Sequence, residues 1–170
     1  MDLQLRNSKV VLCGATGLLG KTIALELARE GANIALLGRN SNSLKTLKTE
    51  IEAIGSPGAL AIECQLDSET STNHAICTAI ETLGGIDVFI FAAGAAQGGI
   101  FWEIDDVTWK SNLEVKLFGA IRALRTVAPA MIERHAGRIV VVVGNSAKFP
   151  EPRMLPGAAA NAALLAIVRG

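Results

Sequence analysis

Short apolar runs alternate with amphipathic stretches along the whole chain. Five runs have the length and composition of buried strands, at residues 10–12, 33–37, 60–62, 88–91 and 139–143. Between them, apolar residues recur every three or four positions, which is typical of helices that pack one face on a core. The alternation predicts a Rossmann-type α/β fold, in which a doubly wound parallel sheet has right-handed crossovers and strand order 3-2-1-4-5. We expect one domain over residues 1–170.

Capping residues and helix breakers predict the helix ends in the first half of the chain. Ser41 is the expected N-cap of the second helix, and the glycine- and proline-containing stretch 55–58 stops that helix. Either Ser68 or Ser71 caps the third helix, which Gly84 ends.

The second half of the chain carries the longest amphipathic stretch. It predicts a helix over 105–134, in which Pro129 introduces a kink or marks the last turns. The run 139–143 consists of five β-branched residues and therefore predicts a central strand covered on both faces. A proline-rich loop, 149–156, leads to an alanine-rich helix over 158–168.

Three glycines lie between the first strand and the first helix. Gly14 allows a tight turn out of the strand, Gly17 leaves the backbone open to a pyrophosphate, and Gly20 lets the helix lie close to the sheet. Free N–H groups at the start of the helix, at the positive end of its dipole, then bind the anion. The spacing is G-x-x-G-x-x-G, and its position between strand and helix predicts a dinucleotide site rather than a glycine-rich turn without a ligand.

Small or polar residues also follow the other predicted strands. Ligands of such sheets bind beyond the carboxyl ends of the strands, where the strand order reverses. We therefore expect the turns that follow the first, second, fourth and fifth strands to lie along one rim, at residues 14–20, 38–39, 92–94 and 144–146.

Arg39 decides the expected type of dinucleotide. A carboxylate at the end of the second strand favours NAD, but here Gly38 and Arg39 occupy that place. Arginine can pair with a 2′-phosphate in bidentate fashion, so NADP(H) is preferred, unless Arg39 is only a solvated loop residue. Asp67, after the third strand, either accepts the adenine amine or caps a helix.

Composition excludes several classes of function. The 170 residues carry a formal net charge of zero, so no field attracts nucleic acid or an acidic membrane surface. Cys13, Cys64 and Cys77 show no zinc or C-x-x-C spacing and predict reduced thiols in a cytoplasmic protein. His74 and His135 are isolated, and no metal site is expected. Residues 1–6 do not resemble a signal peptide, and no apolar run is long enough to span a bilayer.

Several motifs together resemble the short-chain dehydrogenase/reductase family, from about residue 9 to 143 and less clearly to 170. They are the glycine turn, Asp87, the sequence Ala92-Ala93-Gly94, Trp109 with Val115 and Gly119, Pro129 with Met131, and Gly137-Arg138-Ile139-Val140. The resemblance implies a nicotinamide cofactor and hydride exchange with a small carbonyl compound or secondary alcohol. The expected cofactor-binding set is Gly14, Thr16, Gly17, Leu18, Leu19, Gly20, Arg39, Asp67, Ala92, Ala93 and Gly94.

The catalytic residues depart from the family pattern. The Tyr-x-x-x-Lys pair falls on Asn161 and Leu165, and the sequence contains no tyrosine at all. The family serine falls on Gly144 in strict register, or on Ser146 after a short insertion, and the family asparagine falls on Lys116. Asn161 cannot give up a proton near neutral pH, so we expect Lys116 to assist proton transfer, unless its side chain only extends to solvent. We expect Ser146 or Asn161 to orient the substrate oxygen.

Three functions follow from this pattern. The first is an NADP(H)-dependent oxidoreductase from a divergent branch without the Tyr-x-x-x-Lys pair. The second is a nucleotide-binding protein without turnover, or a fragment that has lost turnover. The glycine spacing also resembles that of extended-family enzymes that act on nucleotide sugars. This third function is disfavoured, because the resemblance implies that such enzymes also use a Tyr-x-x-x-Lys pair, which this sequence lacks. We expect the sequence, either as a truncated product or as a divergent minimal form, to be without the family's later strands and so to leave a sheet edge open. We expect a homo-oligomer if the last helix folds.

Overall fold

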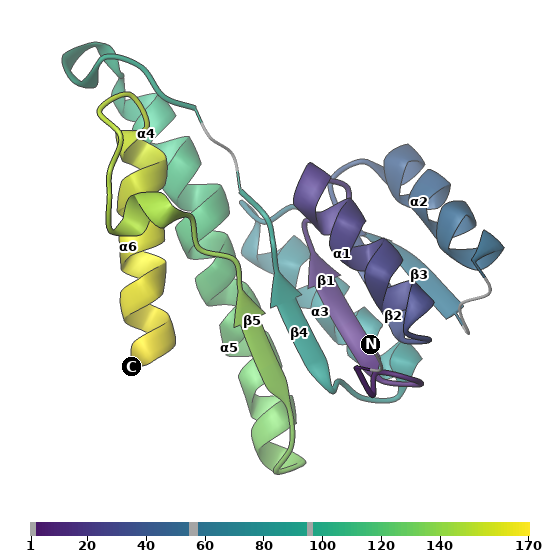
Figure 1. Ribbon diagram of the computed structural model, residues 1–170. Coiled ribbons are helices and arrows are strands. Elements are labelled where there is room, and N and C mark those ends of the chain that lie inside the picture. The colour runs from purple at the N-terminus through teal and green to yellow at the C-terminus, as the bar shows by residue number, and fades with distance from the viewer. Residues whose placement is uncertain (1–2, 55–57, 95–96) are drawn as a thin grey trace.

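The computed structural model describes residues 3–54, 58–94 and 97–170 and contains a parallel sheet flanked by helices (Figure 1). The predicted end of the second helix at 55–58 lies mostly outside the described residues. The strands are β1 Lys9–Cys13, β2 Asn33–Gly38, β3 Gly58–Glu63, β4 Val88–Phe91 and β5 Arg138–Val141. The helices are α1 Leu18–Arg29, α2 Ser41–Ala53, α3 Glu69–Leu83, α4 Asp106–Leu113, α5 Gly119–Glu133 and α6 Leu155–Arg169.

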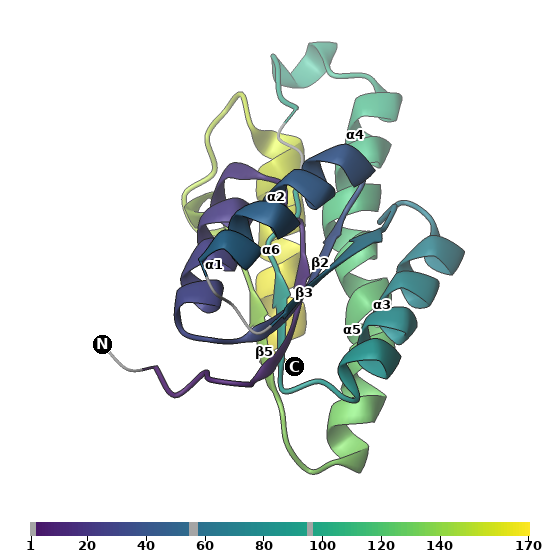
Figure 2. The same cartoon turned by 90° about the vertical axis from the view of Figure 1, so that its right-hand side faces the viewer.

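The five strands form one sheet in the order β3-β2-β1-β4-β5, with every pair parallel, which confirms the predicted topology. α1 and α2 cover one face of the sheet, and α3 and α5 cover the other (Figure 2). Successive residues of β1 point to opposite cores, with Val10 and Leu12 facing α1 and α2, and Val11 and Cys13 facing α3 and α5. Both faces of the central strand are therefore buried.

Side chains at the helix N-termini decide between the predicted caps. Asn40, not Ser41, caps α2, because its side chain accepts a hydrogen bond from the backbone N–H of Ser43 over 2.9 Å. Ser68 caps α3 by accepting from the N–H of Ser71 over 3.2 Å. The prediction of Ser41 was wrong by one residue, because asparagine is an equally good cap and stands immediately before it.

The predicted long helix contains an interruption. α4 and α5 are joined by a π-helical turn, Glu114–Phe118, in which the backbone stays right-handed. Such turns widen the helix locally and re-aim the side chains that they carry. Pro129 lies inside α5. α6 begins at Leu155, three residues earlier than predicted. Pro156, which was expected to end the loop, lies in the first turn of the helix, where backbone N–H groups have no partner within the helix and proline is therefore tolerated.

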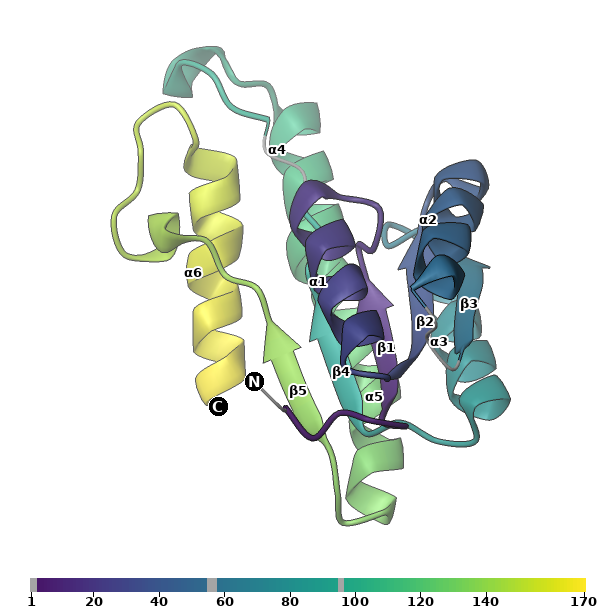
Figure 3. The same ribbon diagram turned by 45° about the vertical axis from the view of Figure 1, so that its right-hand side comes forward.

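The fifth strand is not central. β5 pairs only with β4 among the described strands, and Ile139 and Val140 remain 40% and 48% exposed. Figure 3 shows β5 at the edge of the sheet, with α6 beyond it. The prediction of a covered strand was wrong, because a β-branched run reports extended structure but not how many neighbours cover it. No helix in the described part of the chain is both long and apolar enough to cross a membrane.

Candidate functional site

The turn after β1 and the turn after β4 approach each other very closely. Gly14 has φ +83°, and a Cβ added to it would lie 2.6 Å from the backbone nitrogen of Ala93. A Cβ on Gly20 would overlap the carbonyl oxygen of Gly14. These two glycines therefore let the first turn of α1 pack against the ends of β1 and β4.

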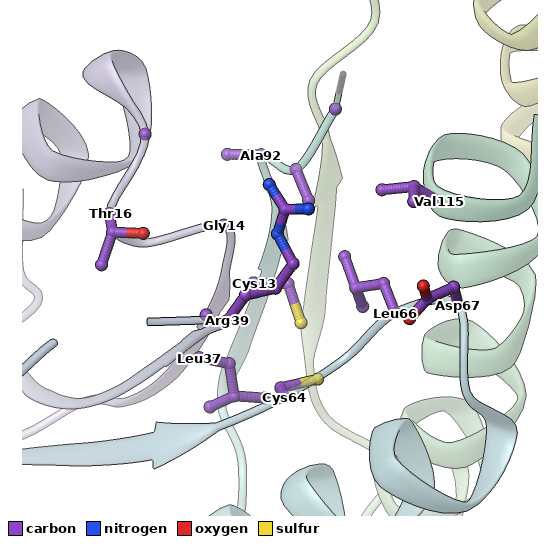
Figure 4. Close-up of a pocket in the computed structure, with 14 residues that line it drawn as sticks. Cys13, Gly14, Thr16, Leu37, Arg39, Cys64, Leu66, Asp67, Ala92 and Val115 are labelled. Atoms are coloured by element: carbon purple, nitrogen blue, oxygen red, sulfur yellow. The ribbon is translucent and has the colours of Figure 1, made fainter. Parts of the chain in front are cut away.

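A cleft of about 280 Å³ opens above these turns, at the carboxyl ends of the strands (Figure 4). Eight of the predicted cofactor-binding residues line it, namely Gly14, Thr16, Gly17, Arg39, Asp67, Ala92, Ala93 and Gly94. Leu18, Leu19 and Gly20 do not line it, and Leu18 is 93% exposed. The N-terminus of α1 stands at the cleft, so its first N–H groups are available to an anion such as a pyrophosphate.

The two charged residues in the described lining of the cleft follow different strands, Arg39 after β2 and Asp67 after β3. The guanidinium of Arg39 extends into the cavity in Figure 4 and makes no ion pair or hydrogen bond with the described residues. Asp67 lies on the far side, next to Leu66. Since Ser68 is the cap of α3, the alternative that Asp67 caps this helix is wrong.

The floor and one wall of the cleft are apolar and were not predicted from the sequence. Cys13 and Cys64 lie at the bottom, where burial raises the pKa of each thiol, that of Cys64 to about 11. Both thiols are therefore neutral near pH 7 and act as small apolar groups. Leu66 and Val115 add an apolar wall that suits a planar ring. Leu66 lies beyond β3, where the chain no longer shows a strand pattern.

A second cavity, of about 320 Å³, adjoins the first. Both cavities are lined by Ala92, Ala93 and Gly94, so they meet at the turn after β4. The second cavity also brings together all three predicted catalytic residues, Lys116, Ser146 and Asn161. Its remaining lining residues are Val142, Met154 and Gly157.

Asn161 is buried, with 4% of its surface exposed, and both ends of its amide are bonded. Its Oδ1 accepts from the N–H of Gly144 over 3.0 Å, and its Nδ2 donates to Oγ of Ser146 over 2.9 Å. A Cβ on Gly144 would lie 2.7 Å from Nδ2 of Asn161, so the glycine is needed for this contact. The structure therefore places the hydroxyl of Ser146, rather than position 144, at the cavity.

Lys116 projects from the π-helical turn along Gly94. A Cβ on Gly94 would lie 3.4 Å from Nζ of Lys116. Burial lowers the pKa of the Lys116 ammonium below its ordinary value, because desolvation disfavours the charged form. Among the described residues, no ion pair or hydrogen bond to Lys116 opposes this effect.

Arg122 fastens the π-helical turn to the wall of the cleft. Its Nη1 donates to the carbonyl oxygen of Leu66 over 3.0 Å, and its Nη2 pairs with Glu114 at the start of the turn. Gly119 allows this approach, since a Cβ there would lie 2.9 Å from Cβ of Leu66. The segment that carries Lys116 is thus fixed relative to the cleft. The described residues hold no group of three or more His, Cys, Asp or Glu side chains that fits a metal ion.

Comparison with known proteins agrees with this geometry. A family model described as "short chain dehydrogenase" matches residues 8–170. The chain belongs to the short-chain dehydrogenase family.

Relatives in this family are longer than the chain. An uncharacterized oxidoreductase of Bacillus subtilis (strain 168), YvrD, is 28% identical over 170 residues, which cover all of this chain and 64% of the relative. Dehydrogenase/reductase SDR family member 7B of Bos taurus is 30% identical over 157 residues, which cover 89% of this chain and 48% of the relative. The chain therefore spans less than two thirds of the length of these relatives.

Solved structures share the fold closely. A variant of actinorhodin polyketide ketoreductase crystallised with NADPH has a TM-score of 0.89 and 28% identity, covering 94% of this chain and 62% of that one. NAD⁺-bound xylitol dehydrogenase has a TM-score of 0.91 and 25% identity, covering 96% of this chain and 63% of that one. The Rossmann-type fold predicted from the sequence is thereby confirmed.

Proposed function

We propose that this chain binds NADP(H) in the glycine cleft and exchanges hydride with a carbonyl compound or secondary alcohol in the adjoining cavity. The observation that carries the proposal is the shared lining of the two cavities by Ala92, Ala93 and Gly94. A dinucleotide that fills the first cavity would end where the second begins. The similar structures that contain NADPH or NAD⁺ support a nicotinamide cofactor.

The cofactor site follows from the residues of the cleft. The N–H groups at the start of α1 and the open backbone at Gly17 suit a pyrophosphate. The unpaired guanidinium of Arg39 suits a 2′-phosphate, which is the reason to prefer NADP(H). When bound, the nicotinamide supplies or accepts the hydride.

The second cavity supplies the polar groups for the substrate. Ser146 donates its hydroxyl hydrogen to the substrate oxygen, because its own Oγ accepts from Asn161. Lys116 gives a proton to that oxygen during reduction, which its lowered pKa makes easier. Asn161 holds Ser146 in place.

Titration with NADPH and NADH tests the cofactor site, and the variant Lys116→Met tests the chemistry. We expect NADPH to bind more tightly than NADH, and Lys116→Met to keep NADPH binding while losing at least 100-fold in kcat. Lys110→Met is the matched control, because Lys110 is an exposed lysine whose ion pair with Asp106 lies on α4, away from both cavities. Unchanged turnover in Lys116→Met would remove the assigned role of Lys116.

A nucleotide-binding protein without turnover is the second candidate. The observation that favours it is the presence of Asn161 and Leu165 where the family pattern has tyrosine and lysine. NADPH binding without turnover of any carbonyl compound by the wild-type chain would establish this alternative.

Three further proposals concern the whole chain. Residues 1–170 form one nucleotide-binding domain, as their continuous βα units suggest. The protein is cytoplasmic, which is consistent with the free thiols of Cys13, Cys64 and Cys77. It forms a homo-oligomer through the α4–α5 and α6 helices, and exposed apolar residues such as Val107 and Phe118 support this. Light scattering that showed a monomer would contradict the last proposal.

A further inference from the structure

Among the described residues, the side chains of the second cavity offer more hydrogen-bond donors than acceptors. Oδ1 of Asn161 already accepts from the N–H of Gly144, and one of the two hydrogens on its Nδ2 is donated to Oγ of Ser146. Because Oγ of Ser146 accepts from Asn161, its own hydrogen is directed elsewhere. The ammonium of Lys116 adds three more hydrogens. A ligand that satisfies these groups must be rich in acceptors.

The charge of Lys116 is uncompensated within the cavity. Lys116 is the only ionisable residue among the nine described residues that line it. Glu114, its nearest acidic neighbour in sequence, is paired with Arg122. Half-burial without a counter-ion is unfavourable for an ammonium, so an anion supplied by a ligand would be bound with little competition.

The N-terminus of α6 faces the same cavity. Met154 and Gly157, which lie on either side of the start of this 15-residue helix, both line it. The first backbone hydrogen bond of α6 runs from the N–H of Ala158 to the carbonyl oxygen of Met154. The N–H of Gly157, one residue earlier, therefore has no carbonyl partner within the helix. The positive end of the helix dipole therefore adds to the charge of Lys116.

We propose that the second cavity binds a 2-oxo acid, with Lys116 and Ser146 holding its carboxylate and its adjacent carbonyl oxygen. The proposal rests on the proposed function, which it deepens by naming the substrate class. In a 2-oxo acid the two acceptor groups are neighbours, so one ammonium can contact both while the hydroxyl of Ser146 donates to the carbonyl. The apolar side chains of Val142 and Met154 are left to contact the rest of the molecule.

The reduction balances with these groups. A hydride from the reduced nicotinamide forms a C–H bond at the carbonyl carbon, and the C=O π bond opens onto its oxygen. One proton passes from Lys116 to that oxygen, which yields a 2-hydroxy acid and the oxidised nicotinamide. The neutral amine of Lys116 then regains a proton from solvent, and its carboxylate contact is restored.

Oxamate and oxamide test the binding site independently of turnover. They have nearly the same planar shape, but only oxamate carries a carboxylate. Calorimetric titration of the full chain, with and without saturating NADPH, should show oxamate bound at least ten-fold more tightly than oxamide. In the wild-type chain with labelled lysine, oxamate should raise the pKa of Lys116 in NMR titrations, whereas oxamide should not.

Two variants identify the residues responsible. Lys116→Gln should abolish the preference for oxamate, and Lys110→Gln, on the exposed side of α4, should retain it. Equal binding of the two probes, or a preference that survives in Lys116→Gln, would overturn the proposal. If Lys116→Gln does not fold, an unchanged Lys116 pKa in the wild type with oxamate overturns it equally. Oxamate selectivity without NADPH binding or turnover would support the anion site and contradict the proposed function alone.

Discussion

The buried amide of Asn161, on α6, donates a hydrogen bond to Oγ of Ser146, in the loop after β5, over 2.9 Å. The same amide accepts from the N–H of Gly144 over 3.0 Å. Both polar ends are thus used inside the protein, so Asn161 acts as an anchor for the loop. Of the two residues expected to orient the substrate oxygen, Ser146 keeps its whole hydroxyl donor, whereas Nδ2 of Asn161 has one of its two hydrogens committed to Ser146.

Asn161→Ala should destabilise the protein. The change leaves the N–H of Gly144 and the hydroxyl of Ser146 without their buried partner, which we expect to lower the free energy of unfolding by about 1–3 kcal/mol. Urea unfolding measures this loss. Ala162→Ser, at an exposed position of α6, is the control and should change the stability by less than about 0.5 kcal/mol. Equal stability of the two variants would show that the amide is not an anchor.

The sequence predicted the site best where backbone geometry decides it. The places of Gly14, Gly17 and Arg39 in the lining of the cleft were predictable, because a strand-to-helix turn and the end of a parallel strand have recognisable residue types. The exposed positions of Leu18 and Leu19 were not foreseeable from the motif, since it fixes the glycines and not the direction of the side chains between them. Their role in cofactor binding stays a prediction.

The fold was predictable to the level of strand order but not in two local features. The π-helical turn Glu114–Phe118 shares the apolar periodicity of an ordinary helix, so nothing in the spacing around Lys116 reveals it. The exposure of β5 depends on which elements lie beside it, which a β-branched run does not report. Both features concern tertiary context, and the first of them directs Lys116 into the second cavity.

Gly20→Ala should weaken both the fold and the cofactor site. The added methyl group would overlap the carbonyl oxygen of Gly14, so α1 would have to move away from the turn that lines the cleft. We expect a loss of about 2–3 kcal/mol in unfolding free energy and at least a ten-fold weaker Kd for NADPH. For stability, Gly157→Ala is the matched control, because its methyl group would meet no atom within 4 Å beyond its chain neighbours and the backbone of its own helix.

The control has the opposite expected sign. Gly157 lies in α6, where alanine is the better helix former, so Gly157→Ala should stabilise the protein by about 0.5–1 kcal/mol. Thermal unfolding of both variants separates a steric effect from a general effect of replacing glycine. A Gly20→Ala variant as stable as the wild type would contradict the close packing of α1.

Arg39→Ala should change the choice of cofactor without changing the fold. The guanidinium is exposed and makes no ion pair with the described residues, so its removal costs little stability. If it pairs with the 2′-phosphate, the Kd for NADPH should rise about 10- to 100-fold, and the Kd for NADH should stay within about two-fold. Fluorescence titration measures both constants. Equal weakening for the two cofactors would mean that Arg39 contacts a part that they share.

Asp87 should make the stability of the fold depend on pH. Burial acts to raise the pKa of the Asp87 carboxyl. Two partners outweigh this effect and lower the pKa below its ordinary value: Lys9, through its backbone N–H and its charge, and Arg134, through a side-chain hydrogen bond and its charge. The N–H of Lys9 lies 2.8 Å from Oδ2, and Nη2 of Arg134 lies 3.0 Å from Oδ1. Asp87 thus ties the start of β1 to the end of α5.

The sign of the effect follows from the lowered pKa. A carboxyl with a lower pKa in the folded state stabilises the protein above its unfolded pKa of about 3.9, and this stabilisation is lost as the pH falls through the folded value. Asp87→Asn should therefore lower the unfolding free energy at pH 7 by about 1 kcal/mol, a modest value because both side chains of the ion pair are more than a third exposed. The difference from the wild type should shrink below about pH 4.

Urea unfolding of both proteins at pH 7, 5 and 3.5 measures this difference. Asp106→Asn is the control, since the ion pair of Asp106 with Lys110 lies on the surface of a single helix, where it contributes a few tenths of a kcal/mol, about 0.3–0.5. A destabilisation by Asp87→Asn that is the same at pH 7 and pH 3.5 would show that the charge of Asp87 is not what stabilises the junction of β1 and α5. The loss would then come from the shape or the hydrogen bonding of the side chain.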